Sequence, residues 1–195
     1  MASSYQGLIF DMDGTLTVPT LDFAAIRAEI GLARSPDLAE QIAALDEAGQ
    51  RRAWRIIESH EQEAIARQQL QPGCAALLGK CRARGLKLAV VTRNTHLSVE
   101  SLCQRFGLNF DLVLTRAFRH IKPHPGPVLH ILDAWRLAPR DVLVIGDYVH
   151  DIDCGRAAGA PTCLFRNPGY TAPGAEPDFV VSSMAELDRL LFAED

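Results

Sequence analysis

The sequence predicts an α/β fold: a Rossmann-like parallel sheet flanked by helices, with an inserted all-helical subdomain. From residue 72 onward, short apolar runs alternate with segments of helical period, which is typical of a parallel sheet covered on both faces. From about residue 21 to 70 the pattern is helical throughout, without an apolar run of strand type. We therefore expect a core of residues 1–18 and 72–195 and a helical insert of residues 19–71.

The core is expected to hold six strands with helices between them. The strands are expected at residues 7–11, 86–92, 111–115, 141–145, 161–165 and 179–181. Helices are expected at 74–84 and 148–158, around Leu97, Leu102 and Phe106, around Val128, Ile131, Leu132 and Trp135, and after a capping box at Ser183. In such sheets ligands bind outside the carboxyl ends of the strands, so functional residues should be sought there.

Three helices are expected in the insert. The first carries Phe23, Ile26 and Ile30, the second starts near Ser35 and Pro36 and ends at Gly49, and the third carries Trp54, Ile57 and Ile65. We expect Trp54, like Trp135 in the core, to pack in the interior. We expect His60 and Glu61 to lie on a solvated helix face.

Composition limits the partners and the compartment. The net charge is −4 and Lys and Arg are scattered, which argues against a nucleic-acid partner, since such a partner favours a basic stripe. The apolar runs are too short to span a membrane, and the first residues lack the pattern of a signal peptide. Five cysteines without a C-x-x-C pair indicate thiols in a reducing compartment, so we expect a cytoplasmic protein with no membrane partner.

The stretch Asp11-Met12-Asp13-Gly14-Thr15 follows the first expected strand and carries two carboxylates one residue apart. On a regular strand alternate side chains share a face, so Asp11 and Asp13 could converge on one point. Two acids this close repel each other, and a cation or a proton between them relieves the repulsion. A polar turn would explain Gly14 and one aspartate, but it gives no reason for the second.

Polar residues also follow the other strands. They are Thr92 and Arg93 after the second strand, Lys122 in the loop after the third, and Asp147 after the fourth, with Asp151 one helical turn later. Because the carboxyl ends of parallel strands meet at one edge of the sheet, we expect these side chains to gather near Asp11.

This edge combines carboxylates, a hydroxyl and an ammonium group. Carboxylate oxygens are the ligands that magnesium prefers, and the Lys122 ammonium and Thr92 hydroxyl can hold the oxygens of an anion. A G-x-S-x-G elbow and a His–Cys pairing are missing from the sequence, so serine or cysteine hydrolase chemistry lacks support. A metal, an anion clamp and a carboxylate nucleophile together indicate phosphoryl transfer through an aspartyl-phosphate.

The chain resembles haloacid-dehalogenase-superfamily phosphatases in four ordered motifs: Asp11-x-Asp13-Gly14-Thr15, Thr92, Lys122-Pro123 and Gly146-Asp147-x-x-x-Asp151. The resemblance runs from residue 7 to about 166, and the helical insert is similar to the small cap of phosphoglycolate-phosphatase-like members. The dehalogenase branch lacks the second aspartate, so Asp13 favours a phosphatase. Two positions depart from the family pattern: Arg93, where members often have Asn, and Tyr148, where many have a small residue.

The resemblance implies a role for each carboxylate. Asp11 would be the nucleophile, and Asp13 would protonate the leaving oxygen and then activate the hydrolytic water. A magnesium ion would be held by the Asp11 carboxylate, the Asp13 backbone carbonyl and Asp147. Asp151 would bind the ion directly or orient its water ligands.

The resemblance also places Thr92 and Lys122 against the oxygens of the phosphoryl group, where charge is stabilised. We expect Arg93, next to Thr92, to bind the phosphate of the substrate as well; the alternative is a surface arginine. The expected protein is a magnesium-dependent phosphomonoester hydrolase that acts on a small phosphorylated metabolite, as a monomer or a homodimer. Two alternatives remain: a sugar-phosphate phosphotransferase resembling phosphoglucomutase, and a non-catalytic binding protein on the same fold.

Overall fold

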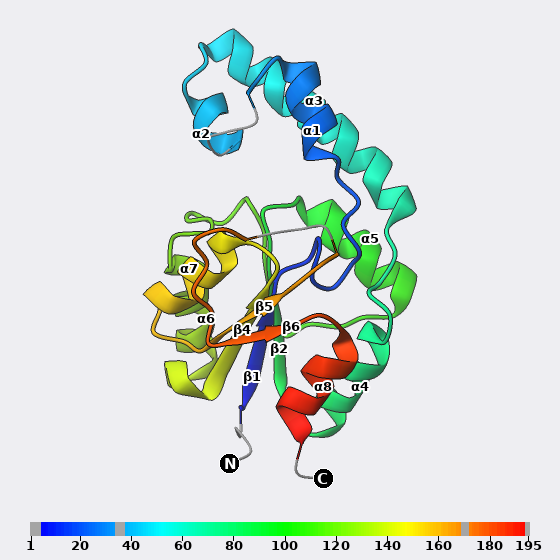
Figure 1. Ribbon diagram of the computed structural model, residues 1–195, viewed down its shortest axis with the longest axis vertical. Helices are drawn as coiled ribbons and strands as arrows, with labels where there is room; N and C mark the ends of the chain where they lie inside the picture. The colour runs from blue at the N-terminus through cyan, green and yellow to red at the C-terminus, as the bar shows by residue number, and fades with distance from the viewer. Residues whose placement is uncertain (1–4, 34–37, 169–171, 194–195) are drawn as a thin grey trace. The chain divides into compact units, whose positions relative to one another are not determined.

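The computed structural model describes residues 5–33, 38–168 and 172–193 (Figure 1). The chain divides into two compact units. We call residues up to Pro19 together with those from Gln69 onward the α/β unit, and Thr20–Gln68 the helical unit. The helix start that we expected at Ser35 and Pro36 lies outside the described residues.

The α/β unit contains one parallel sheet of six strands in the order β3-β2-β1-β4-β5-β6. The strands are β1 (Gly7–Phe10), β2 (Lys87–Val91), β3 (Leu112–Leu114), β4 (Val142–Gly146), β5 (Thr162–Phe165) and β6 (Phe179–Val181). The first strand therefore lies inside the sheet, with β2 on one side and β4 on the other. The prediction of a parallel α/β sheet is confirmed, and it brings the ends of β1, β2 and β4 together at one edge.

Helices cover both faces of this sheet (Figure 1). They are α4 (Cys74–Ala83), α5 (His96–Phe106), α6 (Gly126–Trp135), α7 (Val149–Ala157) and α8 (Met184–Phe192). Leu8 and Phe10 of β1 pack in the cluster that contains α4, α5 and α8, while Ile9 packs in the cluster that contains α6 and α7. This alternation is that of a strand buried on both faces, and it explains why β1 is continuously apolar.

The helical unit consists of α1 (Phe23–Ile30), α2 (Leu38–Ala43) and α3 (Glu47–Arg67), packed around Ile26, Ile42, Ala53 and Ile57. Two expectations for α3 were wrong. Trp54 is 40% exposed, because the buried stripe of α3 runs through Ala53 and Ile57, one residue away. Glu61 continues that stripe and is buried, whereas we expected it in solvent. Its neighbour His60 pairs with Glu29 of α1 at 2.8 Å.

The structure also differs from the expected end of one helix and from the expected buried face of another. Gly49 does not end the second helix: it lies in the first turn of α3, where its N–H donates to the capping carboxylate of Asp46 at 2.7 Å. Leu97 of α5 is 58% exposed, while Trp135 is buried as expected. Among the described residues, the helices are all too short or too polar to cross a bilayer.

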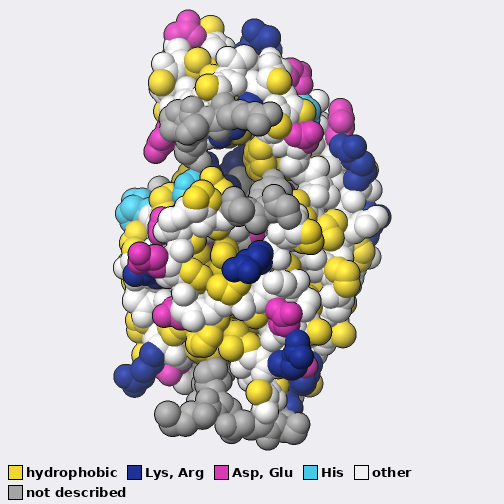
Figure 2. Space-filling model, viewed as in Figure 1, with side chains coloured by type: hydrophobic (Ala, Val, Ile, Leu, Met, Phe, Trp, Pro, Cys, Tyr) yellow, Lys and Arg dark blue, Asp and Glu magenta, His cyan; other side chains and the backbone are white. Residues whose placement is uncertain are grey.

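Lys and Arg side chains are spread over the face drawn in Figure 2, and on its described residues they do not join into a continuous stripe.

Candidate active site

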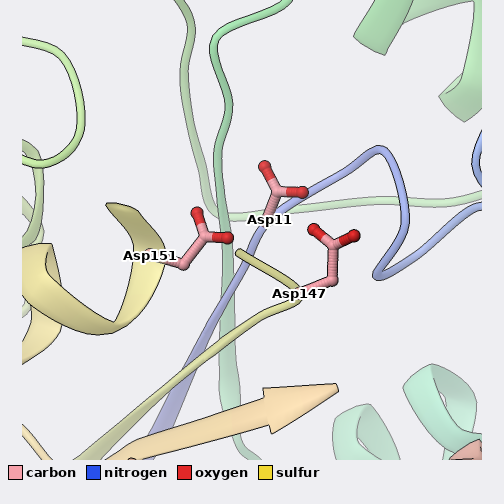
Figure 3. Close-up of side chains that lie close together, drawn as sticks. All are labelled: Asp11, Asp147 and Asp151. Carbon is pink, nitrogen blue, oxygen red and sulfur yellow. The ribbon is translucent and has the colours of Figure 1, made fainter. Parts of the chain in front are cut away.

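Three carboxylates converge at the carboxyl edge of the sheet (Figure 3). Asp11 follows β1, and its backbone N–H continues the ladder by donating to the carbonyl of Ile145 at 2.8 Å. Asp147 follows β4, and Asp151 lies in the first turn of α7. One oxygen from each carboxylate lies within 4.8 Å of the others. The topology thus brings together residues that are far apart in the sequence, as expected for the edge of a parallel sheet.

Lys122 lies among these carboxylates. Its Nζ is 2.5 Å from an oxygen of Asp11 and 2.5 Å from an oxygen of Asp151. All three side chains are at most 10% exposed. Burial alone would lower the pKa of Lys122, but the two carboxylates more than offset it, so the pKa lies above its usual range. Lys122 is therefore an ammonium group at neutral pH.

One ammonium does not neutralise three carboxylates. Burial raises the pKa of Asp11 to about 7, despite the opposing effect of Lys122. Burial also raises the pKa of Asp147 to about 8, and the negative charges of Asp11 and Asp151 add to the shift. A further positive charge would thus reduce the repulsion among these carboxylates. Because its donors are all oxygens, the set fits a hard divalent cation.

Two glycines allow the carboxylates to come this close. Gly14 has φ +87°, in the left-handed region, and a Cβ there would overlap the carboxylate of Asp147. A Cβ on Gly146 would overlap the side chain of Asp151. The chain also turns sharply around Gly14, since the N–H groups of Leu16 and Thr17 both donate to the carbonyl of Met12.

Asp13 lies in that turn and is half-buried. Thr17 donates its hydroxyl to Asp13 Oδ1 at 3.4 Å. The three carboxylates that lie close together are those of Asp11, Asp147 and Asp151, which come from the end of β1, the end of β4 and the first turn of α7. Convergence of Asp13 on the same point stays a prediction, and its negative charge contributes to the raised pKa of Asp147.

Thr92 and Arg93 follow β2, the neighbour of β1. Thr92 is buried, and its hydroxyl oxygen accepts the N–H of Asn94 at 3.1 Å. Arg93 Nη1 lies 2.8 Å from Nδ1 of His150, which stands in the first turn of α7. A guanidinium group can only donate, so this nitrogen of His150 must accept. The contact places a cation at the same edge of the sheet as Asp11.

The two departures from the family pattern meet at His150. The Tyr148 ring contacts the His150 ring edge-on, with 5.0 Å between the centroids, and Arg93 bonds to the same imidazole. His150 is a half-buried helical residue that links Arg93 to α7.

Sequence reasoning missed two buried amides near the cluster, Gln71 and Asn167. Asn167 Nδ2 lies 3.3 Å from Asp147 Oδ2, and Gln71 Nε2 lies 2.9 Å from Asn167 Oδ1. A signal for Asn167 was present, because it stands just after β5, the neighbour of β4, at the same edge of the sheet. Gln71 gave no such signal.

Comparison with known proteins gives several relatives. A haloacid dehalogenase-like hydrolase domain-containing protein of Arabidopsis thaliana is 39% identical over 95% of this chain and 83% of its own. A phosphoglycolate phosphatase of Rhodospirillum rubrum is 27% identical, covering 94% and 87% of the two chains. An N-acetylmuramic acid 6-phosphate phosphatase of Pseudomonas putida is 30% identical, covering 95% and 96%.

The fold also matches solved structures. A HAD-hydrolase from Bacillus subtilis, solved bound to magnesium, superposes with a TM-score of 0.70 at 18% identity, covering 96% of this chain and 99% of that one. Residues 5–159, which contain all four sequence motifs, match the haloacid dehalogenase-like hydrolases as a family. The resemblance inferred from the motifs is confirmed: the chain belongs to the haloacid dehalogenase-like hydrolase family.

Proposed function

We propose that this protein is a magnesium-dependent phosphomonoester hydrolase that acts on a small phosphorylated metabolite through an aspartyl-phosphate. The observation that carries the proposal is the arrangement around Asp11. Its carboxylate is held by the Lys122 ammonium at 2.5 Å and converges with those of Asp147 and Asp151. A buried carboxylate that is oriented by a cation and lies beside a divalent-cation site is suited to attack phosphorus.

Magnesium is proposed because the donors in the carboxylate cluster are all oxygens, and oxygen donors favour hard cations. The magnesium bound in the Bacillus subtilis structure supports the choice. Asp11, Asp147 and Asp151 would hold the ion, together with the backbone carbonyl of Asp13. When bound, it would neutralise charge on the phosphoryl oxygens and on the carboxylates.

The chain's own residues divide the reaction between them. Asp11 attacks phosphorus, so that an Asp11–phosphorus bond forms as the bond to the leaving oxygen breaks, and Asp13 donates a proton to that oxygen. A water molecule then gives its proton to Asp13 and attacks phosphorus, which releases phosphate and restores the Asp11 carboxylate. Thr92, Arg93 and Lys122 hold the phosphoryl oxygens during both steps.

The relatives support the reaction class more than a particular substrate. Two of them are named as phosphatases, one of phosphoglycolate and one of N-acetylmuramic acid 6-phosphate. Both compounds are phosphate monoesters that also carry a carboxylate, but the rest of the two molecules differs. We propose that residues 19–71 form a cap that selects the substrate, and that residues 1–18 and 72–195 form the catalytic core. The five cysteines are free thiols, which suits the cytoplasmic location that we propose.

The test is phosphate release from a panel of phosphorylated metabolites and p-nitrophenyl phosphate, with magnesium and with a chelator. We expect turnover only with magnesium. Asp11→Asn should lower the rate on the order of 10⁴-fold or more, because it removes the nucleophile. Asp153→Asn is the matched control, since Asp153 is an exposed residue of α7, and it should retain activity. Wild-type protein that releases no phosphate from any substrate would overturn the proposal.

A sugar-phosphate phosphotransferase would use the same nucleophile. Analysis of the products formed from a sugar phosphate separates the two functions, because a hydrolase releases inorganic phosphate and a transferase returns the group to a sugar. Partner binding without turnover would instead favour the non-catalytic alternative.

A further inference from the structure

Two buried side-chain amides, Asn167 and Gln71, lie beside the Asp147 carboxylate. They are 5% and 9% exposed. Asn167 follows β5, and Gln71 stands just after the chain returns from the helical unit, so the two are 96 residues apart in the sequence. Buried amides must find hydrogen-bond partners, and the partners found here are parts of the active site.

Both Nδ2 and Oδ1 of Asn167 have hydrogen-bond partners. Nδ2 donates to the backbone carbonyl of Gly14 at 2.6 Å and to Asp147 Oδ2 at 3.3 Å. Oδ1 accepts from Gln71 Nε2 at 2.9 Å. The orientation of this amide follows from chemistry, because a carbonyl and a carboxylate can only accept. The reversed amide would set its oxygen against both.

The Asp147 carboxylate is thereby restrained from two directions. Gly14 packs so closely against it that a Cβ on Gly14 would overlap the carboxylate. Asn167 contacts Oδ2 and holds the carbonyl of the same glycine. An N–H group directed at a carboxylate oxygen limits rotation of the side chain. This restraint prepares Asp147 to bind a cation.

Gln71 supports Asn167 from behind. Besides Asn167 Oδ1, its Nε2 lies 3.4 Å from the carbonyls of Gly14 and Thr17. Its backbone N–H donates to the carbonyl of Leu16 at 2.9 Å. Gln71 thus ties together the chain that leaves the site toward the helical unit and the chain that returns from it.

We propose that Asn167 is a positioning residue that orients the Asp147 carboxylate for the metal, and that Gln71 acts through Asn167. The inference rests on the proposed function, because it assigns a role toward the proposed magnesium ion. Residues that orient a metal ligand through hydrogen bonds typically change metal affinity roughly 10–100-fold when they are removed.

The test measures magnesium binding directly, by isothermal titration calorimetry on chelator-treated full-length protein. Asn167→Ala should weaken magnesium binding roughly 10-fold or more. Gln71→Leu should weaken it less, and the double variant should bind as Asn167→Ala does, because the effect of Gln71 passes through Asn167. Gln69→Ala is the matched control, since that side chain is exposed on the same returning segment, and it should bind as the wild type does.

Hydrolysis of p-nitrophenyl phosphate adds a second measurement. In Asn167→Ala the magnesium concentration for half-maximal rate should rise by the same factor as the dissociation constant, and the rate should recover at saturating magnesium. A purely structural role would lower the thermal midpoint and leave the magnesium affinity of the folded protein unchanged. If Asn167→Ala fails to fold, the magnesium affinity of Gln71→Leu decides between a positioning role and a purely structural one.

The two proposals fail differently. Wild-type protein that binds magnesium and releases phosphate, with unchanged magnesium affinity in both Asn167→Ala and Gln71→Leu, overturns the positioning role alone. Wild-type protein that neither binds magnesium nor releases phosphate overturns both. Strictly additive effects of the two substitutions on affinity would refute the claim that Gln71 acts through Asn167.

Discussion

Nζ of Lys122 lies 2.5 Å from Oδ1 of Asp11, and their side chains are only 5% and 10% exposed. The same ammonium lies 2.5 Å from Asp151. Buried ion pairs contribute little net stability compared with apolar residues of the same shape, but removing one partner leaves an uncompensated buried charge. Lys122 is therefore needed for the fold as well as for the proposed chemistry.

Lys122→Met should destabilise the protein by roughly 3–5 kcal/mol, because it leaves Asp11 and Asp151 buried without their cation. Chemical denaturation without magnesium measures the change. The control is Lys80→Met, which breaks a pair with Asp188 whose side chains are 40% and 36% exposed. Such a pair contributes at most about 1 kcal/mol. Equal losses in the two variants would contradict the prediction.

The stability of the metal-free protein should fall as pH rises. Burial raises the pKa of Asp11 to about 7 and that of Asp147 to about 8. In the unfolded chain these groups lose their protons near pH 4, so between about pH 4 and pH 8 the folded state binds more protons than the unfolded one. The free energy of unfolding must then decrease with pH over this range, by an amount on the order of a few kcal/mol.

Magnesium should reverse this trend, because the ion competes with protons for the same oxygens. Its stabilising effect should grow from about pH 6 to pH 8, which denaturation with and without magnesium would detect. Asp147→Asn removes one titrating group and should flatten the pH dependence of the metal-free protein. A wild-type and an Asp147→Asn profile of equal slope would show that the cluster is not the cause.

Much of the fold was accessible from the sequence because its signals are local. Buried parallel strands give short apolar runs, and polar residues directly after them stand at one edge whatever the strand order. Asp11, Thr92 and Asp147 could therefore be assigned to one edge without coordinates. Helix periodicity likewise placed the core faces of α4 and α6.

What the sequence did not reveal depends on contacts between distant segments. The burial of Glu61 and the exposure of Trp54 depend on which stripe of α3 faces its neighbours, and both amino-acid types suggest the opposite. The bond between Arg93 and His150 joins elements on either side of β1, so no local pattern indicates it. The link between Gln71 and Asn167 is of the same kind.

Gly14→Ala should be more damaging than an alanine at another left-handed glycine. Gly14 has φ +87° and its Cβ would overlap the Asp147 carboxylate, whereas Gly85 has φ +77° and open space around its Cβ position. Gly85→Ala should cost roughly 1–2 kcal/mol for backbone conformation alone. Gly14→Ala should cost more than this and also weaken magnesium binding, because Asp147 must move. Denaturation and calorimetry test both expectations. An unchanged magnesium affinity would show that Asp147 tolerates the displacement.

Asp13→Asn should discriminate between leaving groups. If Asp13 protonates the leaving oxygen, its loss should slow the hydrolysis of alkyl phosphates far more than that of p-nitrophenyl phosphate, whose leaving group needs little protonation. Comparison of kcat for the two substrates measures this. The Asp11→Asn variant is the reference, since it should abolish both reactions equally. An equal loss on both substrates in Asp13→Asn would argue against an acid role in the first step.

Arg93→Gln should weaken the binding of phosphate esters. The Arg93 guanidinium is anchored by His150 at 2.8 Å and lies after β2, next to the strand that carries Asp11. A charged hydrogen bond to a phosphoryl oxygen contributes about 1.5–3 kcal/mol, so kcat/KM should fall roughly 10–100-fold.

Comparison of kcat/KM among variants shows whether Arg93 contacts the substrate or only lies on the surface. Arg119→Gln, at an exposed loop residue, should leave kcat/KM unchanged and serves as the control for loss of positive charge. His150→Ala keeps the guanidinium but removes its anchor, so it should cause a smaller loss than Arg93→Gln, and adding it to Arg93→Gln should cost little more. Because Arg93 is proposed to hold the phosphoryl group itself, the loss should be similar for every ester in the panel, p-nitrophenyl phosphate included. A loss confined to esters with a second anionic group would assign Arg93 to the remainder of the substrate instead.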